Sequence, residues 1–178
     1  AAIVAFTACN QADKFQYGKE IVLVTGTDAS PISSDRILAD QVPISYSFSI
    51  SATGVVSEDV KAHIKYDTLA LENYNKANKT TYVAVPQNVL LINDEYVVIP
   101  KGSARSALTS VTMLDNSFIE EGVNYVIPLS VAYLEGGSAQ ILETSKSIFV
   151  KVGKTMESYS LDIPNTSIYS THSLHTNR

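Results

Sequence analysis

Residues 60–66, VKAHIKY, decide the fold class because two kinds of side chain alternate along them. The apolar positions are Val60, Ala62, Ile64 and Tyr66. The polar positions between them are Lys61, His63 and Lys65. Successive side chains of a strand point to opposite faces of a sheet, so this period of two predicts a half-buried antiparallel strand. We expect His63 on the exposed face of that strand.

The same alternation recurs elsewhere in the chain. In residues 44–50, ISYSFSI, serines separate the apolar side chains Ile44, Tyr46, Phe48 and Ile50. Other stretches rich in β-branched and aromatic residues predict strands over 20–24, 81–85, 89–92, 96–99, 106–114, 125–133 and 147–152. About seven to nine strands in a row favour an all-β, antiparallel sandwich over a βαβ fold.

One short helix is predicted over residues 67–76, with Asp67 or Thr68 as its N-cap. It should have one or two turns. Its inward side chains should be Leu69, Leu71 and Tyr74.

Pro128 lies inside the predicted strand 125–133. Proline cannot donate to a ladder, so it is confined to edge strands, strand starts and bulges. We therefore expect residues 125–131 to form an edge strand or a strand bent at Pro128. The alternative is a strand that switches between the two sheets.

Length and composition indicate one ordinary domain with tails: 178 residues, 45% hydrophobic, net charge −5. The scattered Lys and Arg residues give no basic footprint, so no nucleic-acid partner is predicted. A single cysteine excludes an internal disulfide framework and a cysteine-rich metal site.

That cysteine ends the apolar run of residues 1–9, AAIVAFTAC. Ala8 before it and the abrupt polar stretch after it match the end of a bacterial lipoprotein signal peptide, with residues 6–9 as the lipobox. On this interpretation Cys9 carries acyl chains and is the chain's one membrane contact. The alternative is a first strand with a buried core cysteine. The predicted organisation is a signal-peptide remnant over 1–9, a polar tether over 10–18, a β-sandwich over 19–153 and a Ser/Thr-rich tail over 154–178, the tail alternatively being the start of a further domain.

No residue cluster specifies a reaction. His172 and His175 stand in a Ser/Thr-rich stretch without the further ligands a metal site needs. The adjacent acidic pairs at 94–95 and 120–121 fit solvated turns better than an acid/base pair across a cleft. We therefore predict no catalytic residue, no metal and no cofactor, so the chain is not expected to be an enzyme.

Several motifs resemble a family of N-terminal domains of unknown function in Bacteroidetes surface lipoproteins. They are Tyr74-Asn75, Tyr82-Val83-Ala84-Val85-Pro86, Ile99-Pro100-Lys101-Gly102 and Gly122-Val123-Asn124-Tyr125-Val126-Ile127-Pro128-Leu129. Val85 and Ile127 stand where the family usually has Leu, and both keep an apolar side chain. The resemblance implies an immunoglobulin-like sandwich outside the cell, often preceding an endo-glycosidase or lectin-like domain.

Glycan contacts would be natural for such a module. The chain has no Trp but ten Tyr, each with an apolar ring and a polar tip. Tyr17, Tyr159 and Tyr169 lie in polar segments and are the candidates for stacking on sugars, with ordinary tail tyrosines as the alternative. Asp67-Thr68-Leu69 resembles a Bacteroidetes O-glycosylation site at Thr68, with the helix N-cap as the alternative explanation.

Together these observations predict a non-catalytic, lipid-anchored module at the outer membrane or cell surface, with the periplasmic side as the alternative location. It would space, present or assist the binding of glycans or proteins in polysaccharide use. Its partner would be a polysaccharide or a surface glycan-binding protein. One alternative is the N-terminal non-catalytic domain of a larger glycoside hydrolase. Another is a pilus or adhesin subunit whose sheet edge accepts a donor strand.

Overall fold

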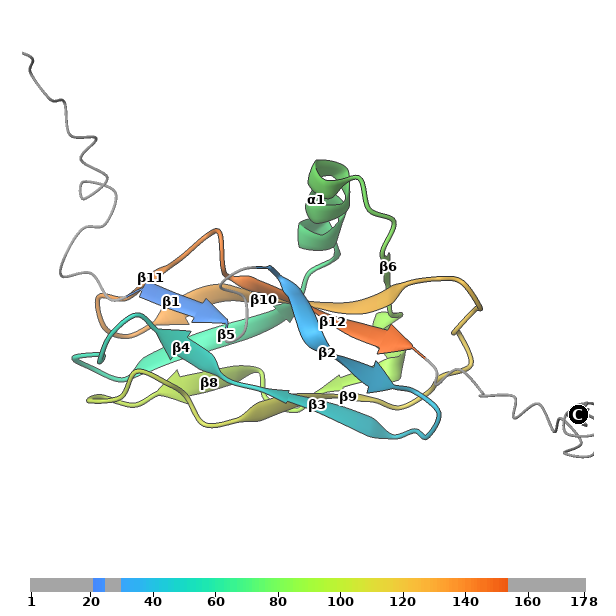
Figure 1. Cartoon of the computed structure of the whole chain (residues 1–178). Coiled ribbons are helices and arrows are strands. Elements are labelled where there is room, and N and C mark those ends of the chain that lie inside the picture. The colour runs from blue at the N-terminus through green and yellow to red at the C-terminus, as the bar shows by residue number, and fades with distance from the viewer. Residues whose placement is uncertain (1–20, 25–29, 154–178) are drawn as a thin grey trace, which may run out of the picture.

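The computed structural model describes residues 21–24 and 30–153, and they form two layers of strands with one α-helix outside them (Figure 1). One layer is a six-stranded sheet in the order β2-β12-β10-β5-β8, with β6 paired to β10. Its strands are β2 (Ile32–Leu38), β5 (Val60–Tyr66), β6 (Val83–Ala84), β8 (Tyr96–Ile99), β10 (Tyr125–Glu135) and β12 (Ser147–Gly153).

The opposing layer consists of two three-stranded sheets, in the orders β3-β9-β7 and β11-β1-β4. Their strands are β1 (Ile21–Val24), β3 (Ile44–Phe48), β4 (Ile50–Ala52), β7 (Leu90–Ile92), β9 (Thr109–Met113) and β11 (Gln140–Ile141). A 3₁₀ turn, η2 (Gln87–Val89), precedes β7. The predicted β-sandwich with one short helix is confirmed.

The core lies between the layers and follows the predicted alternation. Val60 and Ala62 of β5 are fully buried, and Ile127 and Leu129 of β10 join them in the same cluster. From the opposing layer, Phe48 is 5% exposed. Each of the larger side chains, such as Ile127, Leu129 and Phe48, contributes roughly 1.5–3 kcal/mol through burial, so this cluster holds the layers together.

The structure has more strands than expected because several are very short. Strands β5 and β8 match the predicted ranges, whereas β2 was missed. Its sequence, ISSDRIL, has four polar residues in succession and therefore no period of two. Pairing with β12, in parallel, holds it in the sheet. The predicted segments 1–9, 10–18 and 154–178 lie outside the described residues.

Strand β10 is central, between β12 and β5, so its expected place at an edge is wrong. Pro128 pairs with Phe149 of β12, and its carbonyl oxygen accepts a hydrogen bond from the N–H of Asp67. The N–H and C=O groups of one residue in an antiparallel strand point to the same side. The missing N–H of Pro128 therefore faces the point where β5 has ended at Tyr66 and the chain leaves for the helix. No ladder donor is required there.

Helix α1 (Thr68–Asn78) has 11 residues, about three turns rather than the predicted one or two. Asp67 is its N-cap and accepts a hydrogen bond from the N–H of Ala70. Leu71 is buried as predicted, but Leu69 is 63% exposed, which corrects its expected inward position. Residues two apart on a helix point in nearly opposite directions, so only one of these two leucines can face the sheet. Within the described ranges, no helix is long and apolar enough to cross a membrane.

Replacing Asp67 tests the anchoring of α1. The Asp67 carboxylate caps the helix and lies 2.9 Å from Nζ of Lys65. Asp67→Ala should therefore lower the free energy of unfolding by about 1–2 kcal/mol. Asp67→Asn keeps a capping oxygen and should lose less. Urea unfolding of both variants measures the difference, and equal losses would contradict the capping role.

Asp67 also predicts that the stability of the domain depends on pH. Burial opposes ionisation of Asp67, but hydrogen bonds from Lys65, the Ala70 N–H and Ser130 outweigh it and hold the pKa of Asp67 below its ordinary value. A carboxyl whose pKa is lowered by folding stabilises the protein above its unfolded pKa, and this contribution is lost as the pH falls through the folded pKa. The stability advantage of the wild type over Asp67→Asn should therefore shrink as the pH falls from about 5 to about 2. A constant difference over that range would contradict the assignment.

Candidate functional site

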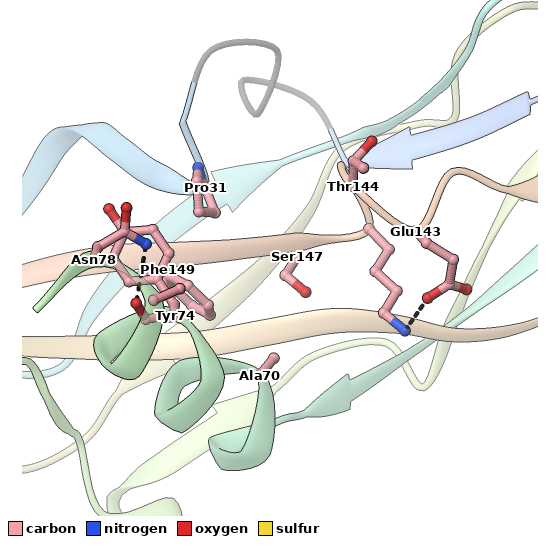
Figure 2. A pocket seen from close by; sticks show the side chains of 10 residues that line it. Pro31, Ala70, Tyr74, Asn78, Glu143, Thr144, Ser147 and Phe149 are labelled. Carbon is pink, nitrogen blue, oxygen red and sulfur yellow. Dashed lines mark hydrogen bonds and ion pairs between the residues drawn. The ribbon is translucent and has the colours of Figure 1, made fainter. Parts of the chain in front are cut away.

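An open groove of about 460 Å³ lies between α1 and the segment that leads into β12 (Figure 2). Helix α1, which forms one side of the groove, lies on the outer face of the six-stranded sheet, away from the core between the layers (Figure 1). The helix lines one side with Ala70, Tyr74, Ala77 and Asn78. The opposite side is lined by Pro31, Glu143, Thr144, Lys146 and Ser147, over a floor at Phe149.

The helix forms its side of the groove through residue spacing. Ala70, Tyr74 and Ala77 stand at positions i, i+4 and i+7, which place them on one stripe of a helix. The two alanines are small and leave room on either side of the tyrosine ring. The groove therefore follows from two small residues flanking one large one.

Phe149 is the buried residue on which the helix packs. It is 1% exposed and forms a second apolar cluster with Leu71 and Val126, separate from the main core. The ring of Tyr74 meets the ring of Phe149 edge-on, with centroids 5.3 Å apart and planes at 66°. Edge-to-face pairs of this kind are favourable beyond the area they bury. They hold α1 against the outer face.

Several polar side chains that line the groove already have a partner within the protein. Nζ of Lys146 lies 2.6 Å from Oε2 of Glu143 on the rim. The hydroxyl of Ser147 lies 2.7 Å from that of Ser130 on β10. Asn78 donates from Nδ2 to the carbonyl oxygen of Tyr74 within the helix. These groups can also contact a ligand that lies along the groove.

The carboxyl and metal-ligating groups of the groove decide which chemistry it can support. Hydrolysis of a glycosidic bond generally requires two carboxyl groups about 5–10 Å apart. Glu143 is the one carboxylate among the described residues that line the groove, and its partner is a lysine. Across residues 21–24 and 30–153, no three side chains of His, Cys, Asp or Glu gather in a way that could hold a metal ion.

Asn75, beside the groove, fixes the loop that follows the helix. Its Nδ2 donates to the carbonyl oxygen of Tyr82 at 2.8 Å. Its Oδ1 accepts hydrogen bonds from the Thr80 hydroxyl at 2.8 Å and from the Tyr82 N–H at 3.2 Å. The Tyr74-Asn75 pair singled out in the sequence thus joins two tasks: the tyrosine packs on the sheet, and the asparagine holds the loop.

The structure leaves most of the predicted site residues outside its description. Cys9, Tyr17, Tyr159 and Tyr169 all lie in segments that are not described, as do His172 and His175. Thr68 is exposed at the first position of α1, and its neighbour Asp67 is the N-cap. O-glycosylation of Thr68 stays a prediction.

Sequence reasoning missed the groove. The small-large-small spacing of Ala70, Tyr74 and Ala77 was the available signal. Its meaning depends on Phe149, which is far away in sequence and reaches the helix only once the sheet has formed.

Comparison with known proteins identifies the family. A model of a family of N-terminal domains matches residues 17–136. The chain belongs to this family. The predicted relationship to a family of N-terminal domains is thereby confirmed. No curated protein sequence matches the chain significantly.

Several solved structures share the fold. A proposed carbohydrate-binding protein from Bacteroides ovatus ATCC 8483 has a TM-score of 0.64 at 12% identity, over 76% of this chain and 37% of its own. A Bacteroides ovatus protein of unknown function has a TM-score of 0.58 at 19% identity, over 76% and 46%. EndoBT-3987 from Bacteroides thetaiotamicron, solved with a Man5GlcNAc product, has a TM-score of 0.53 at 18% identity, over 75% and 30%. The chain thus spans less than half of each of these proteins, and at these identities the likeness concerns the fold alone.

Asn75→Ala tests the role of Asn75. The substitution leaves the Tyr82 N–H, the Tyr82 carbonyl and the Thr80 hydroxyl without their partner, which should lower the free energy of unfolding by about 2 kcal/mol. Asn73→Ala is the matched control, because Asn73 is exposed on the same helix. Its effect should stay within about 0.5 kcal/mol. If Asn75→Ala and Asn73→Ala lowered the free energy of unfolding in urea equally, the role of Asn75 in holding the loop would be contradicted.

Proposed function

We propose that this chain is a non-catalytic module of a surface system for polysaccharide use. It spaces, presents or assists the binding of a glycan or of a glycan-binding partner protein. In this proposal the sandwich brings a ligand close to other domains or proteins, and it leaves bond cleavage to them.

One observation carries the proposal. The same fold makes up 37% of a proposed carbohydrate-binding protein and 30% of EndoBT-3987, which was solved with a glycan product. A domain that recurs as the smaller part of larger proteins with different names is suited to an accessory role. The family description as an N-terminal domain supports the same role.

The groove is consistent with binding. It is open along α1, and its lining combines the ring of Tyr74 with hydroxyl, amide and paired charged groups. Such a mixture suits a ligand with both apolar faces and hydroxyl groups, as sugars have. With one lysine-paired carboxylate, the groove gives no support to hydrolysis by a carboxylate pair.

We also propose that Cys9 anchors the module to the outer membrane at the cell surface through acyl chains. Support comes from the sequence around Cys9 and from the polar stretch that follows it. In this proposal the acyl chains on Cys9 are the chain's contact with the membrane. The periplasmic face is the alternative location.

A second candidate function is the N-terminal, non-catalytic domain of a larger glycoside hydrolase. The fold shared with EndoBT-3987 favours it, because a product complex indicates an enzyme. The coding sequence after Arg178 separates the two: a catalytic domain in the same reading frame supports the second candidate.

A glycan array tests the main proposal. The full chain, fluorescently labelled, should show saturable binding to at least one class of glycan, neutral or charged. Incubation with the bound glycan should release no new reducing ends. Release of reducing ends would contradict the non-catalytic role, and a blank array would contradict a direct part in glycan binding.

Mass spectrometry of the protein from native membranes tests the anchor. We expect a mature chain that starts at Cys9 and carries acyl mass. The variant Cys9→Ser should lose acylation and leave the membrane fraction. A chain that retains residues 1–8 without acyl mass, or unchanged localisation of the variant, would contradict the anchor.

A further inference from the structure

Three aromatic rings form a row across the outer face of the six-stranded sheet, away from the groove. They are Tyr133 of β10, His63 of β5 and Tyr96 of β8, which are direct partners in the strand register. The rings of Tyr133 and His63 stack with centroids 4.1 Å apart and planes at 13°. The ring of Tyr96 lies 5.2 Å from that of His63 at 42°.

A β-bulge places Tyr133 on this face. Along β10, Tyr125, Ile127, Leu129 and Val131 are the inward, core-facing residues. In a regular strand Tyr133 would continue that series and point inward. The register shifts between Val131 and Tyr133, so that Leu134 faces the core and Tyr133 lies opposite His63. Bulges commonly re-aim a side chain in this way near functional sites.

The row leaves its two tyrosines accessible. His63 is on the predicted outward face, yet its side chain is only 12% exposed because the tyrosines cover it. Tyr133 is 51% exposed and Tyr96 is 42% exposed. The imidazole therefore acts as a spacer that fixes both phenol rings.

An ion pair continues the row on the same face. Lys61 and Glu135 are direct partners in the register, with Nζ of Lys61 3.6 Å from Oε2 of Glu135. The same Nζ lies 5.2 Å from the centroid of the Tyr96 ring, and Oε1 of Glu135 lies 3.2 Å from Nε2 of His63 without hydrogen-bond geometry. The side chains of Lys61 and Glu135 are 48% and 49% exposed. The aromatic faces of the row therefore lie beside one positively charged donor, Lys61, and one negatively charged acceptor, Glu135, whose charges balance.

We propose that this aromatic row is a binding site for a neutral glycan. The C–H face of a pyranose ring stacks on Tyr133 or Tyr96, and sugar hydroxyls bond to Glu135 and Lys61. The inference rests on the proposed function in taking a glycan as the ligand, and it names a site separate from the groove.

Charge and area favour a neutral glycan over an acidic polysaccharide and over a protein partner. Balanced charges give no excess attraction for a polyanion such as an acidic polysaccharide. Two half-exposed tyrosines offer roughly 200 Å² of aromatic surface. A standard protein interface buries roughly 800 Å² on each partner, so the row is too small to dock a protein by itself.

The row and the groove share one sheet face. Ser130 of β10, which bonds to Ser147 of the groove lining, is three residues before Tyr133. Three strand residues span roughly 10 Å. Experiments must therefore separate the two sites by substitution, because a bound glycan at either lies over the same sheet.

Affinity gels containing mannan, β-glucan, galactan or xylan test the inference with the full chain. At least one of these neutral polysaccharides should retard the wild type. Tyr133→Ala and Tyr96→Ala should each weaken that binding roughly tenfold, because each removes a stacking surface. Tyr133→Phe keeps the ring and should bind within about twofold of the wild type.

Two controls make the result specific. Leu114→Ala removes an exposed apolar side chain of similar exposure, 49%, outside the row, and should change nothing. Ala77→Phe fills the groove and should also leave binding unchanged. Thermal unfolding of each variant checks that it is folded.

Three outcomes would overturn the inference. Binding that survives both tyrosine-to-alanine substitutions but is lost in Ala77→Phe assigns the ligand to the groove and leaves the proposed function standing. Binding on the array to charged glycans alone, with no retardation in the neutral gels, rejects the ligand class but not the proposed function. Absence of binding in both assays rejects the inference together with a direct glycan-binding role.

Discussion

The register of β10 is the constraint on which the other features of this domain depend. Seven consecutive residues, Tyr125–Val131, are buried, because this strand lies inside the sheet with the core on one face and the helix over part of the other. Its inward side chains close the sandwich. Val126 points to the outer face of the sheet, where it packs with Phe149 and with Leu71 of α1. A slip by one residue would exchange these faces and remove both the core and the seat of the helix.

Two irregularities on β10 shape the outer face without disturbing the core. Pro128 sits where β5 has ended, so the strand passes a position that needs no donor and the chain can leave for α1. The bulge before Tyr133 then reverses the alternation and turns an aromatic side chain outward. The aromatic row is therefore a consequence of the bulge in β10, and the helix that lines the groove packs in part on Val126 of the same strand. The row and the groove both present mixed aromatic and polar groups, which is the chemistry expected of a module that assists glycan binding.

The sequence was sufficient for the fold class and insufficient for the sites. Alternation in β5 identified its range and its buried face, because a half-buried antiparallel strand imposes that pattern directly. Of the positions expected for β10, the one at an edge was wrong, since the rule for proline depends on which side its missing N–H faces, and that side is set by neighbouring strands. Leu69 was misjudged because nothing local decides which of two leucines on α1 faces a sheet. The outward position of Tyr133 was beyond reach, because a bulge is defined by how two strands pair and β10 alone does not show that pairing.

The most direct test of this account is a nuclear magnetic resonance titration of the full chain with oligosaccharides from a neutral polysaccharide. Saturation of the ring protons of Tyr133 and Tyr96 should transfer to sugar C–H protons, and the His63 imidazole resonances should shift as the rings on either side of it engage the sugar. The Tyr74 ring, in the groove, should give no transfer. Transfer from Tyr74 alone, or no transfer from any of these rings, would contradict the claim that the outer face built by β10 presents a glycan-binding row.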